Sequence, residues 1–588
     1  MAIVNRLNCK IGGPAGSGVA VMGALFAKCL QRSGLEVVAT NDYPSLIKGG
    51  HNTHKIRAAP EPIYAMVGRY DMIIALDKLT VQLHASELTE GGAIIYDSNK
   101  VKDAETLANR KDIVLLGAPL SQMATAAGGE IMFNTVALGA AMGIMQLDFS
   151  ILEKLLSSIW ARKGQKVVDA NITAAKAGYE FSHGRTNGEF KIRIEEIKGK
   201  KQKMFINGNE AAVAGAIKAG CKFVAEYPMS PSTAILHLMA GHDFDYGIIV
   251  KQTEDEIAAA NMICGAGFAG VRAMTATSGG GFALMAEALG LMGLMEAPVV
   301  IFEVQRAGPS TGLPTYTEQA DLQFALHASQ GEFPRVVIAP GCPEECYKES
   351  VNAFNIAEMV QTPVIVLLDK YLSESALTVQ DFREIPVKID RGKLQSDEQM
   401  ERATDFKRHA FTEDGISPRC IPGQKNGMHV GSSYEHDETG FTSEAPDMRI
   451  AQINKRARKL KSIPDYMIAP GFYGAEEADA QILLVCWGST KMPMLEALKL
   501  LSADGIKARM MQIKYASPFA SKPVLSALTK AMHSHGNTII FEGNSEAQMR
   551  ALIFEKTGYY IEKTCLRYDG RPFKPEEIAD AAKKMLHK

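Results

Sequence analysis

The stretch KQTEDEIAAANMICGAGFAG, residues 251–270, decides how the rest of the sequence is interpreted. It predicts the end of a β-strand, then Glu254, Asp255 and Glu256 at the start of a helix made mostly of small residues. The helix dipole favours negative charge at that position. The stretch fits an ordinary capped helix packed tightly on a sheet. It also fits a carboxylate that faces a heterocycle nitrogen beside an apolar slot.

The second interpretation points to one cofactor. A carboxyl group of the protein that contacts the pyrimidine ring of thiamin diphosphate promotes the imino tautomer of that ring. The imino group then deprotonates the thiazolium carbon. The alanines and glycines between residues 258 and 269 leave room for a flat ring to come close. The surrounding sequence has to show whether other parts of such a site are present.

The composition is that of an ordinary globular protein. At 588 residues, the chain is expected to hold roughly three or four domains. A net charge of −2 gives no reason to expect nucleic acid or an anionic membrane as a partner. No apolar run is long enough to span a bilayer, and the N-terminus predicts a short strand rather than a secretion signal. We therefore expect a cytoplasmic protein.

The nine cysteines are scattered, which argues against a disulfide framework. Only Cys342 and Cys346 are close together, as CPEEC, and no second pair or nearby histidine accompanies them. A helix that starts after Pro343 explains this spacing better than a metal or cluster site. If the protein takes part in redox chemistry, its iron–sulfur cluster is expected on another chain.

Strands alternate with helices over most of the chain, which predicts α/β domains with parallel, doubly wound sheets. Residues 1–190 form the first such unit, the charged segment 191–203 a linker, and residues 204–385 the second unit. Residues 386–465 break the pattern. We interpret them as an irregular excursion that wraps a neighbouring subunit, with disorder as the alternative. A smaller third unit spans 466–588.

Two glycine-rich turns follow strands of the first unit. GGPAGSG, residues 12–18, offers backbone amides to a phosphate or pyrophosphate. Its glycine spacing disfavours NAD, while a nucleotide-like group such as coenzyme A and a purely structural turn both remain open. KGGHN, residues 48–52, belongs to the predicted loop SLIKGGHNTHK, where Lys48 and His51 either meet phosphates or are solvated.

Polar loops also follow strands of the second unit, where open α/β sheets bind ligands. In EYPMSPST, residues 226–233, Ser230 is a candidate ligand contact; the alternative is a helix whose N-cap is Ser232. In QRAGPSTGLPT, residues 305–315, Arg306 either grips a carboxylate with its planar guanidinium or forms a salt bridge at a subunit contact.

Two further segments complete the pattern. The glycines of TSGGGF, residues 277–282, permit the close approach of a ring or a backbone. The basic run KRARKLK, residues 455–461, has no interleaved aromatic residues. We therefore interpret it as a solvated or subunit-facing helix rather than a nucleic-acid contact.

These motifs, in this order, resemble a known family. Residues 204–588 resemble the alpha subunit of the 2-oxoacid:acceptor (ferredoxin/flavodoxin) oxidoreductases, and residues 1–190 resemble the gamma domain that some members carry ahead of it. The resemblance rests on EYPMSPST, QTEDEIAA, TSGGGF, QRAGPSTGLPTYTEQADL, DGISPRCIPG with EHDETG, and KRARK. The DGISPR…EHDETG excursion is most similar to the 2-oxoglutarate branch.

The sequence departs from the family pattern at a few positions. Met229 and Ser230 stand where the family has Ile and Thr, and Ala547 takes a usual glycine position. The segment ALHASQGEFP replaces a loop that carries glycine, histidine and glycine in many members. These departures affect the expected shape of the substrate rather than the chemistry.

The resemblance implies a three-domain α/β chain: a gamma-type domain, a doubly wound domain that binds the pyrimidine of thiamin diphosphate, and a transketolase C-terminal-like domain. It implies CoA-dependent oxidative decarboxylation of 2-oxoglutarate to succinyl-CoA, CO₂ and reduced ferredoxin, in a reaction that is expected to be reversible. Pyruvate, branched-chain 2-oxoacids and arylpyruvates are alternative substrates. An inactive thiamin-fold scaffold that recruits a partner, and a transketolase-like or NAD-linked enzyme acting alone, are the rival functions.

The resemblance also implies partners. The chain has no GDG followed by the asparagine of the Mg²⁺–diphosphate signature. We therefore expect a beta subunit that shares the thiamin diphosphate and holds Mg²⁺ and a [4Fe–4S] cluster, an (αβ)₂ heterotetramer, and ferredoxin or flavodoxin as electron acceptor.

The family's motifs assign roles to residues of this chain. Glu256, fourteen positions before Gly270, corresponds to the carboxylate that activates the cofactor. The expected substrate contacts are Ser230, Arg306, Ser310 and Thr311, and the expected contacts on the thiamin pyrimidine side are Tyr227, Pro228, Glu256, Ser278, Gly279 and Gly280. Coenzyme A is assigned to Gly13, Gly16, Lys48, Gly49, Gly50, His51 and Asn52, and no metal ligand is expected.

Overall fold

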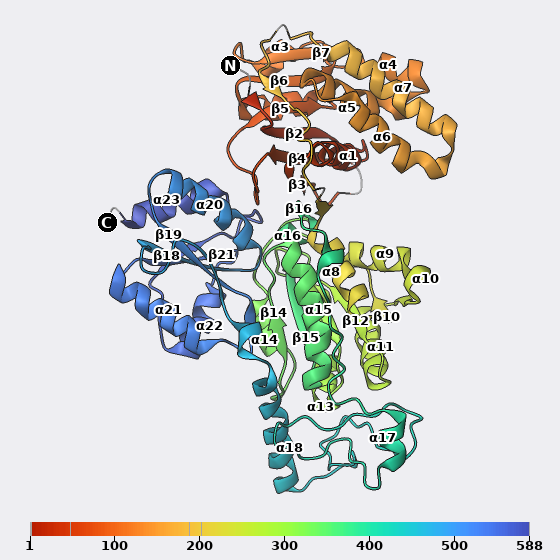
Figure 1. The fold of residues 1–588 in the computed structure, drawn as a ribbon, viewed down its shortest axis with the longest axis vertical. Coiled ribbons are helices and arrows are strands. Elements are labelled where there is room, and N and C mark those ends of the chain that lie inside the picture. The colour runs from red at the N-terminus through yellow and green to blue at the C-terminus, as the bar shows by residue number, and fades with distance from the viewer. Residues whose placement is uncertain (1–2, 47–48, 187, 202, 587–588) are drawn as a thin grey trace. The chain divides into compact units, whose positions relative to one another are not determined.

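The computed structural model describes residues 3–46, 49–186, 188–201 and 203–586. The chain divides into two compact units (Figure 1). The first comprises the chain up to Ile206 together with Ser375–Asp381 and Lys574–Glu576. The second holds the remainder. No helix in the described part of the chain is both long enough and apolar enough to cross a bilayer.

The first unit is built on an eight-stranded sheet in the order β7-β6-β5-β2-β4-β3-β16-β9. The strands are β2 (Leu7–Pro14), β3 (Glu36–Asp42), β4 (His51–Ala59), β5 (Tyr70–Ala75), β6 (Leu88–Asp97), β7 (Val114–Ala118), β9 (Met204–Ile206) and β16 (Ala376–Val379). The helices are α1 (Val19–Arg32), α2 (Lys78–His84), α3 (Ala104–Ala108), α4 (Leu120–Ala127), α5 (Phe133–Ile144), α6 (Phe149–Trp160) and α7 (Gln165–Ser182). The apolar residues of α1, α4, α5 and α6 form one large core with the sheet.

The prediction of a wholly parallel sheet is wrong for this unit. β2, β5, β6 and β7 are parallel, but β4 pairs antiparallel with both β2 and β3. Most of β4 lies in the segment predicted as a loop. The strand was not recognised because histidines, an asparagine and a lysine obscure its alternation of polar and apolar residues. One of them, His54, is buried and packs on α1, where a Cβ added to Gly23 would lie 2.1 Å from the imidazole Cδ2.

The segment predicted as a linker lies within the first unit. In its residues 191–201 and 203, β8 (Ile192–Arg193) pairs with β1 (Ile3–Val4), and Ile192 and Ile194 are buried in the core. Lys200 and Lys203 form ion pairs with the buried carboxylate of Glu36, at 3.1 and 2.9 Å.

The second unit contains two sheets. The larger follows the order β11-β10-β12-β13-β15-β14-β20, and all its strands except β20 are parallel, as the sequence predicts. Its strands are β10 (Phe223–Glu226), β11 (Ile249–Gln252), β12 (Ala273–Thr277), β13 (Val300–Gln305), β14 (Val336–Ile338), β15 (Val364–Asp369) and β20 (Tyr515–Ser517). The helices around it are α8 (Gly208–Lys218), α9 (Thr233–Gly241), α10 (Asp243–Tyr246), α11 (Glu256–Phe268), α12 (Gly279–Leu284), α13 (Ala286–Leu294), α14 (Leu322–His327), α15 (Pro343–Val360) and α16 (Lys370–Glu374).

The smaller sheet has the order β17-β19-β18-β21-β22 and is formed by the C-terminal part of the chain. Its elements are β17 (Gly471–Gly474), β18 (Ile482–Trp487), β19 (Ala508–Ile513), β21 (Thr538–Glu542) and β22 (Lys563–Leu566), with α19 (Asp465–Ile468), α20 (Lys491–Ala503), α21 (Ser521–Ser534), α22 (Gln548–Thr557) and α23 (Pro575–Leu586). The larger sheet extends into this part of the chain through β20, which pairs antiparallel with β14.

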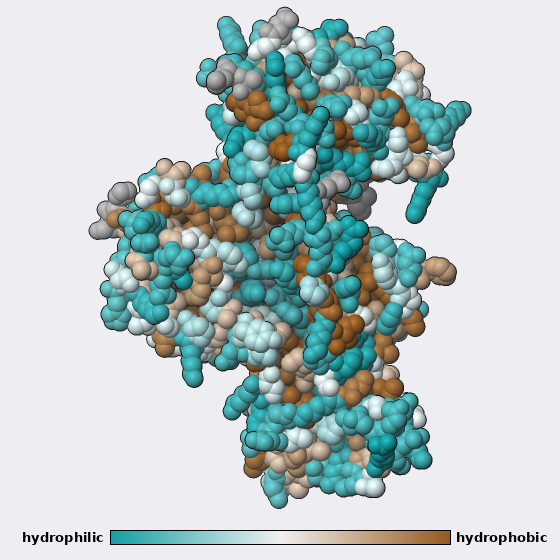
Figure 2. Space-filling model, viewed as in Figure 1, coloured by the Kyte–Doolittle hydropathy of each residue, from teal (hydrophilic) through white to brown (hydrophobic). Residues whose placement is uncertain are grey.

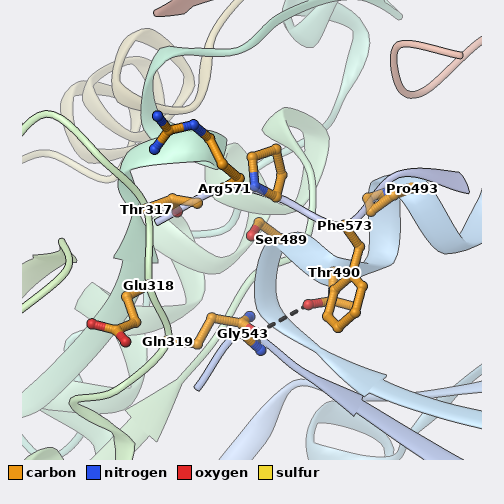
Figure 3. A pocket seen from close by; sticks show the side chains of 10 residues that line it. Thr317, Glu318, Gln319, Ser489, Thr490, Pro493, Gly543, Arg571 and Phe573 are labelled. Carbon is orange, nitrogen blue, oxygen red and sulfur yellow. Dashed lines mark hydrogen bonds between the residues drawn. The ribbon is translucent and has the colours of Figure 1, made fainter. Parts of the chain in front are cut away.

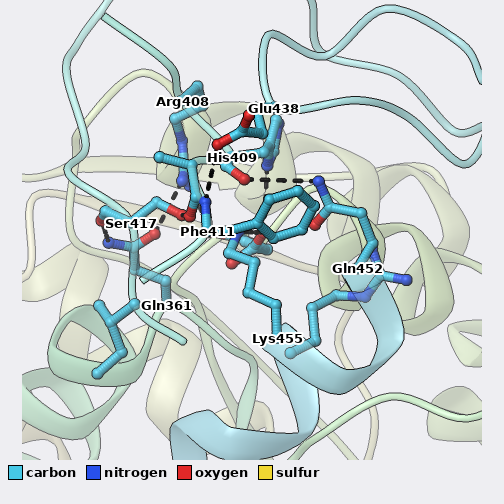
Figure 4. A network of polar contacts seen from close by, with 12 residues as sticks. Gln361, Arg408, His409, Phe411, Ser417, Glu438, Gln452 and Lys455 are labelled. Atoms are coloured by element: carbon cyan, nitrogen blue, oxygen red, sulfur yellow. Dashed lines mark hydrogen bonds and ion pairs between the residues drawn. The ribbon is translucent and has the colours of Figure 1, made fainter. Parts of the chain in front are cut away.

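Residues 386–465 are largely irregular, with α17 (Asp397–Arg402) and α18 (Pro446–Arg458) as their helices. They are anchored by Glu296, which is fully buried after α13. Figure 4 shows two of the residues that contact it, His409 and Lys455. Lys455 Nζ lies 2.6 Å and His409 Nδ1 3.1 Å from Glu296 Oε1, and Lys459 pairs with the other oxygen. Burial by itself would raise the pKa of Glu296, but Lys455 and Lys459 outweigh it and hold that pKa well below its usual range.

The basic run is therefore not the solvated or subunit-facing helix that the sequence indicates. Lys455 and Lys459 are buried, and Arg456 is buried against Glu435. Their acidic partner Glu296 is far away in sequence, so no local pattern reveals it.

Removing the charge at Glu296 should destabilise the second unit strongly. Glu296→Gln leaves two buried lysines without a counter-charge, which costs roughly 3–5 kcal/mol. We expect a clearly lower thermal unfolding midpoint, whereas the matched change Glu398→Gln, at an exposed position of α17, should leave it unchanged. Because the folded pKa of Glu296 is depressed, its contribution is present above the unfolded pKa and lost as pH falls through the folded one. The difference in unfolding midpoint between the wild type and Glu296→Gln should therefore become smaller at acidic pH. A difference that does not change with pH would contradict this account.

Candidate active site

Four loops of the second unit leave the larger sheet at the same edge. Because β10, β11, β12 and β13 are parallel and adjacent, the segments that follow their carboxyl ends converge there. Open α/β sheets bind ligands at this edge. The residues predicted for the cofactor and the substrate all lie in these four segments.

Glu256 is the first residue of α11 and points into the protein. Asp255 caps the helix by accepting a hydrogen bond from the Ala258 amide at 2.7 Å, and the Thr253 hydroxyl fixes the turn by donating to the Asp255 carbonyl at 2.8 Å. Glu256 is only 3% exposed, and its Oε1 has no hydrogen-bond partner among the described residues. Glu254, by contrast, is exposed. Because a buried polar atom without a partner is costly, Glu256 has the properties of a ligand-binding group.

The first turn of α12 lies directly against this carboxylate. A Cβ added to Gly281 would lie 2.1 Å from Thr277 Oγ1 and 2.6 Å from Glu256 Oε1. Of the predicted glycines, Gly279 packs against the carboxylate of Asp321, and Gly280 faces open space. The sequence analysis includes Gly281 among the glycines that permit the close approach of a ring, but it assigns cofactor contacts only to Gly279 and Gly280.

Ser278 is the N-cap of α12, and its buried hydroxyl makes no hydrogen bond to the described residues. Together with Glu256 it gives two unpartnered buried oxygens beside one glycine-lined surface. These groups fit the pyrimidine half of thiamin diphosphate. A carboxylate oxygen is available for a ring nitrogen, and the glycines leave space for the ring.

Arg306 joins the loop after β13 to the loop after β10. Its Nη1 donates to the carbonyl oxygen of Ser230 at 2.7 Å, while its Nε is buried without a partner in the described chain. The loop after β10 also contacts β12, because the Met229 sulfur lies 4.0 Å from Thr277 Oγ1. Burial lowers the pKa of Arg306, and the nearby Asp321 partly offsets this. The contact between Arg306 and Ser230 thus uses the serine carbonyl and leaves its exposed hydroxyl free of this bond.

Other predicted residues are less closely connected. Ser310 and Thr311 are exposed in the loop after β13, and within the described residues neither side chain is hydrogen-bonded to Glu256 or Arg306. Tyr227 is 37% exposed and Pro228 is half-buried beside it.

Glu226 is a site residue that the sequence analysis did not single out. It is the last residue of β10, completely buried, and its Oε2 has no partner within the described ranges. Ser232 Oγ donates to its other oxygen at 3.5 Å, and burial raises its pKa well above the usual value. A charged residue at the end of a buried strand was the signal for it.

The two glycine turns of the first unit lie together. Pro14 of β2 pairs with His51 of β4, and the Ala15 amide donates to the Gly50 carbonyl at 3.2 Å. Gly16, Gly49 and Gly50 have positive φ, and Gly13 packs on Ser17, whose Oγ would be 2.9 Å from an added Cβ. His51 Nε2 lies 2.9 Å from His84 Nε2, and the side-chain oxygen of Asn52 is buried without a partner in the described chain. Lys48 lies outside the described residues.

A separate pocket of the second unit holds none of the predicted site residues. It is small and lies between the loop before α14 and the smaller sheet (Figure 3). Gln319 crosses its wall: its amide nitrogen donates to the Trp487 carbonyl at 3.0 Å, and its oxygen accepts from Thr490 and from the Gly543 amide at 2.9 and 2.8 Å. These bonds fix the segment that carries Asp321.

One group of side chains has the composition of a metal site. Atoms of Glu296, His409 and His436 lie within 4.8 Å of one another. However, Lys455 and Lys459 already neutralise Glu296, so a cation would meet net positive charge. We interpret this group as structural.

The chain matches two known families. The family described as "Pyruvate flavodoxin/ferredoxin oxidoreductase, thiamine diP-bdg" matches residues 214–455, which include all four loops. The family "Pyruvate ferredoxin/flavodoxin oxidoreductase" matches residues 8–181 of the first unit.

Individual relatives match over nearly the whole chain. The alpha subunit of 2-oxoacid:ferredoxin oxidoreductase 2 from Aeropyrum pernix is 31% identical, over 98% of this chain and 97% of that protein. The 2-oxoglutarate oxidoreductase subunit KorA from Mycobacterium tuberculosis is 28% identical, over 87% and 82%. The structure of 2-oxoglutarate:ferredoxin oxidoreductase from Magnetococcus marinus with 2-oxoglutarate, coenzyme A and succinyl-CoA bound is similar with a TM-score of 0.89 and 30% identity, over 99% of this chain and 100% of that one.

The close contact at Gly281 predicts a sharp difference between two glycines. In Gly281→Ala the new methyl overlaps Thr277 and Glu256, and overpacking of this kind costs roughly 1–3 kcal/mol. Gly265 lies on α11, where an added Cβ meets nothing within 4 Å, so Gly265→Ala should be neutral or stabilising. Thermal unfolding of the purified chain measures both. Equal midpoints for the two variants would show that Gly281 does not touch the carboxylate as described.

Proposed function

Since the chain belongs to the 2-oxoacid:ferredoxin oxidoreductases, as an alpha subunit, we propose that it carries the thiamin-activating half of an enzyme that acts on 2-oxoglutarate. The reaction is oxidative decarboxylation: 2-oxoglutarate, coenzyme A and two oxidised ferredoxins give succinyl-CoA, CO₂, two reduced ferredoxins and a proton. The observation that carries the proposal is the buried, unpartnered oxygen of Glu256 against the glycines of α12. The choice of 2-oxoglutarate is supported by the two relatives named for that substrate.

With thiamin diphosphate bound, Glu256 would accept a hydrogen bond from the pyrimidine ring and would thereby favour the reactive tautomer of the ring. The chemistry that thiamin diphosphate brings when bound is a carbon nucleophile for the keto group and an electron sink after CO₂ is lost. Gly279, Gly280 and Gly281 leave room for the ring, and the Ser278 hydroxyl is available as a further polar contact. Tyr227 and Pro228 line the approach from the loop after β10.

Arg306 binds a carboxylate of the 2-oxoacid. Its guanidinium is held at one end by the Ser230 carbonyl, which leaves other N–H groups for a planar, two-point contact. We assign the Ser230 hydroxyl to the keto region, and Ser310 and Thr311, on the adjacent exposed loop, to the rest of the substrate.

A beta subunit completes the enzyme. The sequence lacks the Mg²⁺–diphosphate motif and its cysteines are dispersed, so we assign Mg²⁺, the diphosphate and the [4Fe–4S] cluster to that subunit. The outer face of α11 suits such a partner: Ile257 and Met262 are 48% and 37% exposed. Hydrophobic side chains are visible on the part of the surface that carries α10 and α11 (Figure 2). Ferredoxin or flavodoxin accepts the electrons, the assembly is (αβ)₂, and the enzyme is cytoplasmic.

Coenzyme A binds the paired glycine turns of the first unit. Backbone amides around Gly13, Gly16, Gly49 and Gly50 suit phosphates, and Lys48, His51 and Asn52 add polar groups.

The substrate is tested by producing the chain with the beta subunit encoded beside it and following ferredoxin reduction. We expect CoA-dependent reduction with 2-oxoglutarate and a much smaller kcat/KM with pyruvate and branched-chain 2-oxoacids. A preference for pyruvate would change the assigned substrate but leave the proposed type of reaction unchanged. Inactivity with every 2-oxoacid, in a complex that has bound thiamin diphosphate, would favour a scaffold role.

Glu256→Gln should lower turnover of the complex by a factor of roughly 10² or more, because the neutral amide activates the ring poorly. The control is Glu254→Gln, which removes an exposed carboxylate two residues away and should keep normal turnover. Gel filtration checks that both variants still assemble. An active Glu256→Gln together with an inactive Glu254→Gln would reverse the assignment.

Arg306→Lys keeps the positive charge but loses the planar fork. We expect kcat/KM for the 2-oxoacid to fall by the equivalent of roughly 1–3 kcal/mol, with the KM for coenzyme A unchanged. Arg449→Lys, at an exposed position, is the matched control. If both variants behave like the wild type, Arg306 belongs to a subunit contact and not to the substrate site.

A further inference from the structure

We propose that Glu303 and Asp321 share a single proton at the edge of the larger sheet, and that this pair positions Arg306 for the substrate. Glu303 is the protonated partner and Asp321 the ionised one. The inference deepens the proposed function and rests on it for the activity measurements, while its central claim, the shared proton, is tested independently of activity.

Glu303 lies on β13 and is completely buried. Neither of its carboxyl oxygens receives a hydrogen bond from an N–H or O–H group in the part of the chain that the structure describes. Its acidic neighbour is Asp321, whose carboxylate packs on Gly279, two residues beyond Thr277, the register partner of Glu303. Asp321 is held there because its amide donates to the side chain of Gln305, two residues beyond Glu303, at 3.1 Å.

A hydrogen bond between two carboxyl groups requires a proton on one of them, since ionised carboxylates only accept. Two ionised carboxylates in contact inside a protein also repel each other strongly, so one of them takes up a proton. The pair therefore carries one proton and one negative charge.

The surroundings decide where the proton resides. Glu303 faces acidic groups on both sides, Asp321 and Asp369, and burial followed by these charges raises its pKa well above the usual value. Asp369 is already supplied with donors by Thr317 Oγ1 and the Leu372 amide, at 3.1 and 3.0 Å, so it remains an acceptor and does not relieve Glu303.

Asp321 has different neighbours. It faces the guanidinium of Arg306, with the carboxylate of Glu318 as a further charge from the loop before α14. Burial raises the pKa of Asp321, and the interactions with Glu303 and Arg306, which favour its anion, only partly oppose that rise. Since burial and acidic neighbours raise the pKa of Glu303 further, we place the proton on Glu303 and the negative charge on Asp321.

The location of Asp321 gives the pair its role. Its carboxylate packs on Gly279, where an added Cβ would lie 2.5 Å from Oδ2, and thus reaches the turn assigned to the cofactor. On its other side it draws Arg306 toward the site, while the Arg306 Nε remains without a partner in the described chain. With one negative charge the pair holds the guanidinium in place. If Glu303 also ionised, a second charge would pull Arg306 toward the sheet and away from an anionic substrate.

Isosteric amide substitutions test which residue carries the proton. In Glu303→Gln the amide N–H₂ can still donate to Asp321, so the native hydrogen bond is preserved. In Asp321→Asn the charge next to Arg306 is lost. We expect Asp321→Asn to lower kcat/KM for the 2-oxoacid at least roughly tenfold more than Glu303→Gln does, mainly through KM. The opposite order would place the proton on Asp321 and overturn the assignment.

The pH profile adds a measurement that a purely structural role would not change. In the wild type, kcat/KM should fall at alkaline pH as Glu303 ionises. Glu303→Gln has no such group, so this fall should be absent. Identical alkaline limbs in the two proteins would exclude Glu303 as the titrating group and sink the inference.

Thermal unfolding tests the shared proton without any activity. Because the folded pKa of Glu303 is raised, its stabilising contribution is complete below the unfolded pKa and is lost as pH rises through the folded one. The unfolding midpoint of the wild type should therefore decline relative to Glu303→Gln over that range, while Glu254→Gln should follow the wild type. Parallel curves for the wild type and Glu303→Gln would refute the shared proton. If instead the curves diverge but no 2-oxoacid is turned over, the pair stands and the proposed function fails.

Discussion

The parallel register of β11, β10, β12 and β13 is the constraint on which the site depends. Each strand ends at the same edge of the sheet, so the segments that follow them have to meet although they are far apart in sequence. This is how the first turn of α12 comes to lie on Glu256, and how Arg306 reaches the Ser230 carbonyl. A strand reversed or displaced in this order would separate these groups even if every residue were kept.

The parts of the candidate site that could be located from the sequence are those with a local signal. Acidic residues before a helix of small residues identify α11, and the capping geometry then separates buried Glu256 from exposed Glu254. Gly281 was expected only to permit a close approach, and its contact with Glu256 was not predicted. Asp321 was not identified. Each of the two acts on a group contributed by another loop, so the neighbouring sequence does not reveal the contact. The roles assigned to Ser310 and Thr311 came from the family resemblance and stay predictions.

The same distinction holds for the fold. Strands such as β13 and β15 of the larger sheet are buried throughout and mostly apolar, which is typical of parallel strands and makes the α/β pattern recognisable in the sequence. The errors involve polar residues that become buried. β4 was taken as a loop because of its histidines and asparagine, and Lys455 and Lys459 were taken as solvated. In both cases the compensating partner, the surface of α1 for His54 and Glu296 for the lysines, lies elsewhere in the chain.

Buried charge is treated in opposite ways at the two edges of the larger sheet. Glu296 precedes β13 at the amino edge and is fully compensated by two lysines and a histidine. Glu226 and Glu256 at the carboxyl edge are equally buried, but no described cation pairs with either, and each keeps an oxygen without a partner. Burying a carboxyl group without hydrogen-bond partners lowers stability, and burial raises the pKa of Glu226 in response. A ligand that supplied the missing hydrogen bonds would recover part of this free energy, so the contrast with Glu296 agrees with the placement of the candidate site at the carboxyl edge.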